Sequence, residues 1–194
     1  MELEDRIVFN NCHLQNCTED HCLVGPAIFR NCSIDGLRTQ EGGIRIDGAL
    51  FDQVTIKGDV GTFRVMSDAT CIELEFDAAL HQANRDLYAD VDWAIDISTA
   101  FAKDLTLYGI PPELIRYDPQ RQAIVRRKNV EHSFSTAIEA CGKTIFGVCI
   151  DNLRYFPNAD NVCFTTPSNG DVESHNKVIS ELRRLGFADE APRT

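Results

Sequence analysis

The chain has 194 residues, of which 43% are apolar and 25% charged, and its net charge is −11. This length fits one domain or at most two small ones, and the apolar fraction argues against wholesale disorder. The negative charge argues against direct nucleic-acid binding, which needs a basic face, and leaves room for a protein partner with a basic surface. No apolar run approaches the ~18 residues of a membrane span, and the acidic start is unlike an export signal. We therefore expect a cytoplasmic protein without membrane contact, with reduced cysteines.

Three segments near the N-terminus repeat one pattern. Phe9, Phe29 and Phe51 occupy the same position in each, at intervals of 20 and 22 residues. Other aligned positions hold an amide, then a small or apolar residue, then an aliphatic residue, then a residue that tolerates left-handed backbone. In that order these are Asn11, Asn31 and Gln53; Cys12, Cys32 and Val54; Leu14, Ile34 and Ile56; and Asn16, Gly36 and Gly58.

This period is typical of a parallel β-solenoid, in which repeats stack to bury a thin apolar stripe. We predict a β-rich α+β fold that starts with a short right-handed parallel β-helix over residues 1–75. A fourth, degraded repeat is expected at Thr99–Phe101, continuing to Gly109. A two-sheet β-sandwich is the alternative. The stacked Phe and Leu interior resembles that of the pentapeptide-repeat and β-helix class, although these repeats vary in length.

Residues 76–194 are expected to form a mixed α+β part packed against the β-helix. Apolar spacing predicts helices at Phe76–Tyr88, at Phe134–Cys141 and through Val178–Leu185. It predicts strands at Trp93–Ile97, Gln122–Arg127, Ile145–Ile150 and Val162–Thr165. The segments Val91–Ser98, Gly109–Pro111, Leu114–Arg116 and Asp118–Pro119, with Gln122, resemble a stretch found in uncharacterised bacterial proteins with a β-rich N-terminal part. This resemblance implies a bacterial cytoplasmic protein and implies no activity.

Cysteine and histidine side chains cluster in the first repeats. Six potential zinc ligands lie close together, but the chain has no C-x-x-C pair. The repeat also accounts for Cys12 and Cys32 as small core residues. We therefore expect no metal and no other cofactor, while zinc binding stays an open alternative for Cys12, Cys17, His21 and Cys22.

Acidic residues crowd one short segment that contains the only tryptophan. Asp86, Asp90, Asp92 and Asp96 could bind a basic partner, hold a divalent cation through carboxylate oxygens, or form a solvated face opposite Trp93. The basic residues Arg116, Arg121, Arg126, Arg127 and Lys128 are expected to pair with the protein's own carboxylates.

Catalytic signatures are weak. The motif Cys141–Thr144 imitates a phosphate-binding loop but has Ala137 where that loop needs glycine. A Cys–His nucleophile pair would have to come from residues without a local signature: Cys141, Cys149, Cys163, His132 and His175. We assign no catalytic residue.

The sequence thus favours a non-enzymatic protein–protein interaction module, such as a toxin-neutralising immunity protein or an adaptor, with the four aspartates as its binding residues. The first alternative is an enzyme that uses the Asp86–Asp96 cluster with a divalent metal, or a Cys/His site. The second is an acidic DNA mimic. The oligomeric state is left open.

Overall fold

Each of the three repeats contributes one strand to each of three sheets. The computed structural model describes residues 6–40, 42–68, 74–168 and 172–190. The first sheet holds β1 (Ile7–Asn10), β4 (Ala27–Arg30) and β7 (Leu50–Asp52). The second begins with β2 (His13–Glu19), β5 (Ser33–Thr39) and β8 (Val54–Asp59), and the third with β3 (Leu23–Val24), β6 (Ile44–Asp47) and β9 (Thr62–Met66). All these strands pair in parallel.

The predicted alignment of the repeats is confirmed as a pairing register. Phe9 pairs with Phe29 and Phe29 with Phe51, and their rings stack with centroids 5.0 and 5.5 Å apart. The aliphatic position is also in register, from Leu14 through Ile34 to Ile56. The amide and corner positions have positive φ, between 51° and 71°, at Asn11, Asn31, Gln53, Asn16, Gly36 and Gly58. Glycine suits the later repeats because a Cβ on Gly36 would lie 3.0 Å from the Asn16 side chain.

The later strands join the same sheets. The second sheet gains β10 (Ile95–Asp96) and β13 (Ile115–Arg116), and β11 (Ala100–Phe101) pairs with another part of β8. The third gains β12 (Asp104–Tyr108), then β15 (Asn161–Thr165) and β14 (Gln122–Arg126), and β15 is antiparallel to both of its neighbours.

The predicted fold class is therefore wrong. The chain forms three mostly parallel or mixed sheets with a few helices, an α/β-like arrangement, and not a single right-handed β-helix followed by an α+β part. The repeat pattern specifies strand length and register for residues 7–66 alone. It contains no information about the strands after residue 75, which extend two of these sheets and make one of them mixed.

The fourth repeat is also wrongly aligned. Phe101 pairs with Asp59 instead of Phe51 and is 50% exposed. The position beside Val54 is filled by Ile95. The rest of the predicted repeat is displaced as well, since Leu105 and Leu107 pair with Phe63 and Val65 in the third sheet instead of lying beside Val54 and Ile56.

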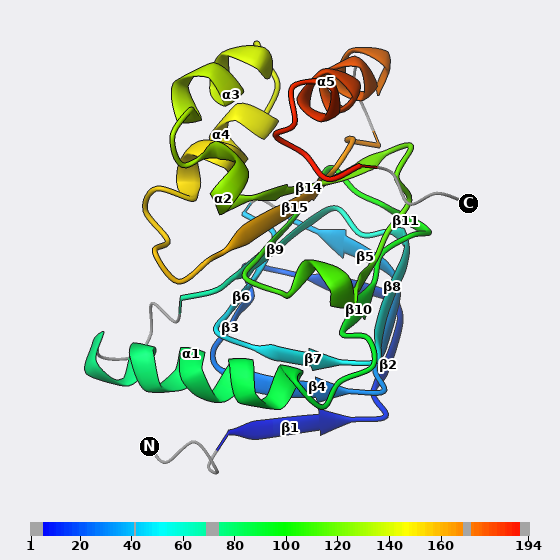
Figure 1. Ribbon diagram of the computed structural model, residues 1–194. Helices are drawn as coiled ribbons and strands as arrows, with labels where there is room; N and C mark the ends of the chain where they lie inside the picture. Colours follow the sequence, from blue (N-terminus) through cyan, green and yellow to red (C-terminus); the bar gives the residue numbers. More distant parts are fainter. Residues whose placement is uncertain (1–5, 41, 69–73, 169–171, 191–194) are drawn as a thin grey trace.

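The helices lie at two places in the molecule. Helix α1 (Leu74–Tyr88) runs beside β4 and β7, whereas α2 (Arg127–Val130), α3 (Phe134–Ala140), α4 (Phe146–Asn152) and α5 (Val172–Arg184) gather at the end far from β1 (Figure 1). The predictions of α1, α3, α5, β14 and β15 are confirmed within a few residues. The predicted strand Ile145–Ile150 is instead α4, because Phe146, Cys149 and Ile150 are buried at helical spacing.

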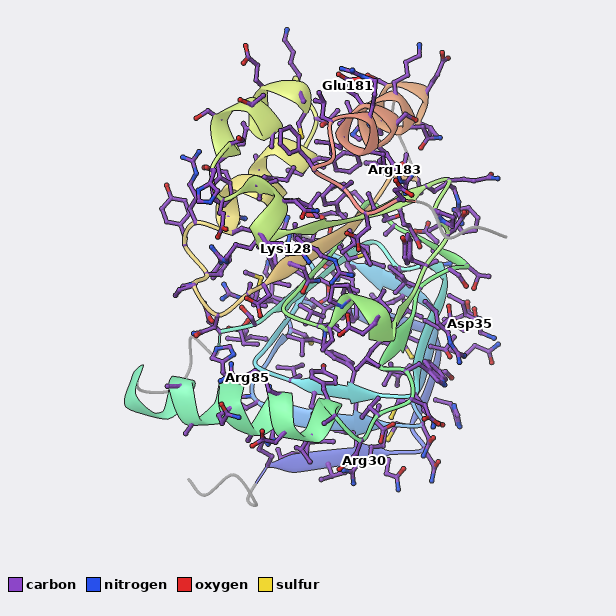
Figure 2. All side chains as sticks on the ribbon, in the orientation of Figure 1. Arg30, Asp35, Arg85, Lys128, Glu181 and Arg183 are labelled. Atoms are coloured by element: carbon purple, nitrogen blue, oxygen red, sulfur yellow. The ribbon has the colours of Figure 1, made fainter. Side chains whose placement is uncertain are left out.

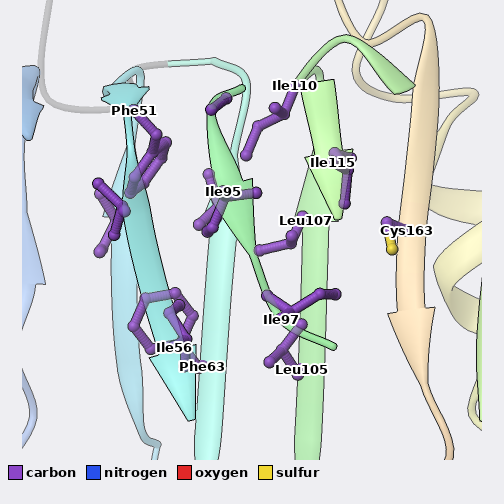
Figure 3. Packing of buried hydrophobic residues seen from close by; sticks show 14 of the residues in the cluster. Phe51, Ile56, Phe63, Ile95, Ile97, Leu105, Leu107, Ile110, Ile115 and Cys163 are labelled. Carbon is purple, nitrogen blue, oxygen red and sulfur yellow. The ribbon is translucent and has the colours of Figure 1, made fainter. Parts of the chain in front are cut away.

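Two apolar clusters form the interior. The larger one fills the space between the sheets and includes Phe51, Ile56, Ile95, Leu107 and Cys163 (Figure 3). The smaller one packs α3, α4 and α5 on β14 and β15. None of the helices in the described ranges is long and apolar enough to cross a membrane.

Candidate functional site

A polar cleft of about 290 Å³ lies between α1 and the third sheet. Its walls come from α1, the residue before β7, the end of β9, the loop that follows β12, the end of β14, and the start of β15 with the loop before it. These segments are far apart in sequence and meet because β9, β12 and β15 are consecutive strands of one sheet. The volume is at the lower end of the ~300–1,000 Å³ range of small-molecule sites.

One face of α1 forms the first wall. His81, Asn84, Arg85 and Tyr88 recur at helical spacing and line the cleft. Two of them tie the helix to the sheets. The Phe51 backbone N–H donates to the Tyr88 hydroxyl at 3.3 Å, and Asn84 donates to the Gly48 carbonyl at 3.2 Å. Arg85 is exposed at the mouth (Figure 2).

A carboxylate behind the wall holds three of the lining residues. Asp68 Oδ1 accepts hydrogen bonds from His81 Nε2 at 3.0 Å, from Asn158 Nδ2 at 3.2 Å and from Ser67 Oγ at 3.3 Å. Burial raises the pKa of Asp68, but these hydrogen bonds together outweigh burial and hold the pKa below its usual value. Asp68 therefore stays ionised and fixes α1 to the loop before β15.

The opposite wall contains a buried donor for which the described part of the chain offers no acceptor. Asn161 lines the cleft at the start of β15 and is 1% exposed. Its Nδ2 has no hydrogen-bond partner among the described residues. The neighbouring backbone is close-packed, since Gly109 donates to the Asn161 carbonyl at 3.2 Å and has φ 74°. A Cβ on Gly109 would lie 2.7 Å from the Ser67 Cβ.

Charges of both signs surround the mouth. Arg126 is held by Asp189, with Nε–O distances of 3.0 and 2.9 Å, and lies 3.8 Å from Glu113. Arg85 donates to the neutral Gln82 side chain at 2.7 Å and has no carboxylate partner among the described residues. Asp160 is exposed at the same mouth.

The groups of the cleft suit binding better than bond cleavage. The Ser67 hydroxyl donates to Asp68 and not to His81, so it is not arranged as a nucleophile beside its base. The cysteines suggested as nucleophiles lie elsewhere, and burial raises the pKa of Cys141 to about 12 and that of Cys149 to about 11. A thiolate at either position is negligible at neutral pH.

The structure spreads the four predicted aspartates over separate local contacts. Asp86 accepts from Gln82 within α1 at 2.8 Å, while Asp90 and Asp92 are exposed. Asp96 accepts from the Ser98 backbone N–H at 3.0 Å and from its hydroxyl at 2.7 Å, so it stabilises a turn. Trp93 is half-buried, and the Arg116 guanidinium lies 4.3 Å from its ring centre.

The cysteine and histidine side chains of the first repeats do not form a metal site within the described part of the chain. Within the described ranges no group of three or more His, Cys, Asp or Glu side chains is placed to hold a metal ion. Cys32 is buried as predicted, but the prediction of a buried Cys12 is wrong. Cys12 belongs to the first repeat, and no strand among the described residues lies beyond that repeat to cover it.

The basic residues pair largely within the protein. Arg121 binds Asp118 at 2.8 Å, and Arg126 binds Asp189. Arg127 instead donates to backbone carbonyls, among them that of Leu153 at 2.6 Å. The expectation of internal carboxylate partners is confirmed for Arg121 and Arg126.

Sequence reasoning missed the cleft residues Asp68, His81 and Asn161. One signal was present in α1, where His81 and Asn84 interrupt the buried face that also holds Leu80 and Tyr88. The other two residues carry no local pattern.

Comparisons with protein-family models, curated proteins and solved structures find no match for this chain.

Proposed function

We propose that the protein binds a small zwitterionic carboxylate, in the simplest case a free amino acid, in the cleft beside α1. The observation that carries this proposal is the Asn161 side-chain amide, whose Nδ2 is buried and has no acceptor among the described residues. This Nδ2 is closed off from solvent in the ligand-free protein, so a ligand oxygen pairs with it only when the side chain turns into the cleft. A buried donor left unpaired costs about 1–3 kcal/mol, and relief of that cost favours the turn. The volume of about 290 Å³ limits the ligand to a small molecule.

The charges of the mouth support the choice of ligand. Arg85 offers a guanidinium without a carboxylate partner among the described residues, which is the group that best binds a carboxylate. Glu113 and Asp160 place negative charge at the same mouth, where an ammonium group would be favoured. A dianion without an ammonium group is disfavoured by those two carboxylates.

The experiment measures thermal stability with the free L-amino acids as probes, and with succinate and glucose as chemical controls. A ligand at a hundred times its Kd stabilises a protein by ~2.7 kcal/mol, which for a chain of this size raises the Tm by about 5–10 °C. We expect one or more amino acids to do so, and succinate and glucose to have no effect.

Asn161→Leu separates a ligand-binding role from a structural one. Removing an unpaired donor leaves the unfolding free energy of the ligand-free protein unchanged or higher, yet it abolishes the amino-acid effect. Thr165→Val is the matched control, because Thr165 is buried on the same strand, its hydroxyl has no partner in the described ranges, and it does not line the cleft. It should keep the amino-acid effect. A marked loss of stability in Asn161→Leu without any probe effect in the wild type would contradict the proposal.

A second proposal follows from the acidic segment: a non-enzymatic module that binds a basic protein. What supports it is that Asp90 and Asp92 are exposed beside the half-buried Trp93, since an aromatic side chain next to charge is typical of binding hot spots. Asp90→Lys with Asp92→Lys tests it without touching the turn that Asp96 stabilises. The wild type and the variant are immobilised in equal amount and exposed to the same lysate. A protein that the wild type retains in equal amount to itself, that salt releases, and that the variant does not retain supports the proposal. Equal retention by both contradicts it.

A further inference from the structure

The three sheets end together at the first repeat. Strands β1, β2 and β3 are each the outermost strand of their sheet and lie at the end of the molecule far from α3–α5 (Figure 1). Each pairs on one side with the second repeat, and on its other side no strand of the described residues follows. The backbone N–H and C=O groups of that side form a template for another strand.

Apolar side chains are concentrated on these strands. Exposed fractions are 65% for Ile7, 50% for Val8, 36% for Phe9, 46% for Leu14 and 58% for Leu23. They account for five of the eleven large apolar side chains that are exposed in the described ranges. The same positions are buried two repeats further on, where Leu50, Phe51 and Ile56 are at most 1% exposed. The first repeat is exposed because no strand of the described ranges stacks on it, although its residues are of the core type.

Strands β1, β2 and β3 also lack the exposed charges that usually keep strand edges apart, and the exposed carboxylate of Asp20 lies in the turn after β2 instead of on a strand. Natural edges carry lysine, proline or inward charges that prevent pairing with another chain. Strand β1 has no charged residue, and β2 has only Glu19, which is 7% exposed and accepts from the Cys22 backbone N–H at 3.0 Å. The adjacent Arg6 is also turned inward and donates to Asn84 at 2.6 Å.

This neutrality identifies the partner. Two chains of net charge −11 repel each other over most of their surfaces, so they can approach closely only through an uncharged face. A basic or an acidic partner finds no complementary charge on β1 and β2. A second copy of the same edge is also uncharged along its strands and also apolar, so it matches this edge in charge and in apolar character.

We infer that two copies of this chain associate through the edge formed by β1, β2 and β3, about a two-fold axis. Two-fold symmetry makes β1 antiparallel to β1 of the second copy, so the unpaired backbone groups of both strands are satisfied. The five side chains expose on the order of 400 Å² of apolar surface, as large as the main patch of many monomers. With the polar Asn10, His13 and Gln15 of the same strands this approaches the ~800 Å² that each partner buries in a standard interface.

Sedimentation velocity over a range of protein concentrations tests the inference. The wild type should sediment as a species of twice 21.7 kDa that dissociates on dilution. Val8→Lys with Leu14→Lys should sediment as a monomer, because it places like charges on both sides of the two-fold axis. The matched control is Val148→Lys with Tyr155→Lys, since these two side chains are 55% and 70% exposed. They belong to α4 and the turn after it, and α4 lies at the opposite end of the molecule (Figure 1). The control should remain dimeric.

The edge variant and the control variant add the same number of lysines, so comparing their association states separates an effect at the edge from an effect of net charge. Both double variants make the net charge less negative by the same amount, so general electrostatics would strengthen association in both. Only an interface at the edge predicts opposite outcomes. Circular dichroism at low concentration checks that each monomer is folded, and Leu23→Lys alone replaces the edge variant if it is not. A monomeric wild type, as expected if residues 1–5 or another protein cover the edge, overturns the inference. Filaments, or equal behaviour of the two variants, do so too.

Discussion

Shortening the stacked phenylalanines should destabilise the protein in proportion to their depth in the stack. Phe51 is 1% exposed, and a Phe→Ala change in a core costs about 3–5 kcal/mol. Phe29 is half-buried between two rings at 5.0 and 5.5 Å, so its loss should cost about 2–3 kcal/mol. Phe9 is 36% exposed and has one stacked neighbour, so its change to alanine should cost about 1 kcal/mol of unfolding free energy.

Urea unfolding of the three variants, at concentrations low enough to keep the chain monomeric, measures these differences. At about 2–4 °C per kcal/mol, Phe51→Ala should also lower the Tm by roughly 10 °C. Phe101→Ala is the control, because the sequence alignment places Phe101 in the same column whereas the structure places it beside Asp59, 50% exposed. It should cost less than about 1 kcal/mol. Equal losses for all three stacked residues, or a loss in Phe101→Ala as large as in Phe51→Ala, would refute the reasoning.

Two further outcomes are expected. The pKa of Asp68 is held below its usual value, so its carboxylate stabilises the fold above the unfolded-state pKa of ~3.9 and loses that effect as the pH falls through the folded-state pKa. The excess stability of the wild type over Asp68→Asn should therefore shrink below a pH of about 4, and a difference that persists in stronger acid would count against the hydrogen-bonded carboxylate. In the native protein, maleimide should label the exposed Cys12 and Cys22 and spare the buried Cys141 and Cys163 until denaturant is added, as followed by mass spectrometry. Fast native labelling of Cys163 would contradict its complete burial.

The repeat could be read from the sequence because it is local and periodic. Phe9, Phe29 and Phe51 are separated by nearly constant intervals, and side chains at equal positions in parallel strands lie beside one another. The positive φ of Asn16 and Gly36 was likewise predictable, because few residues accept that backbone conformation. The helices α1 and α5 were predictable from their spacing of apolar residues.

Tertiary structure decided the rest. The sequence carries no mark of which strand extends which sheet, so the path of residues 95–126 and the antiparallel β15 were not predictable. A short apolar run such as Phe146–Ile150 fits a strand or a helix, and only its packing under α3 and α5 made it helical. The cleft likewise depends on three sheet neighbours far apart in the chain. Long-range strand pairing brings Asp68 to His81 and places Asn161 on the same cleft, and no local pattern encodes this.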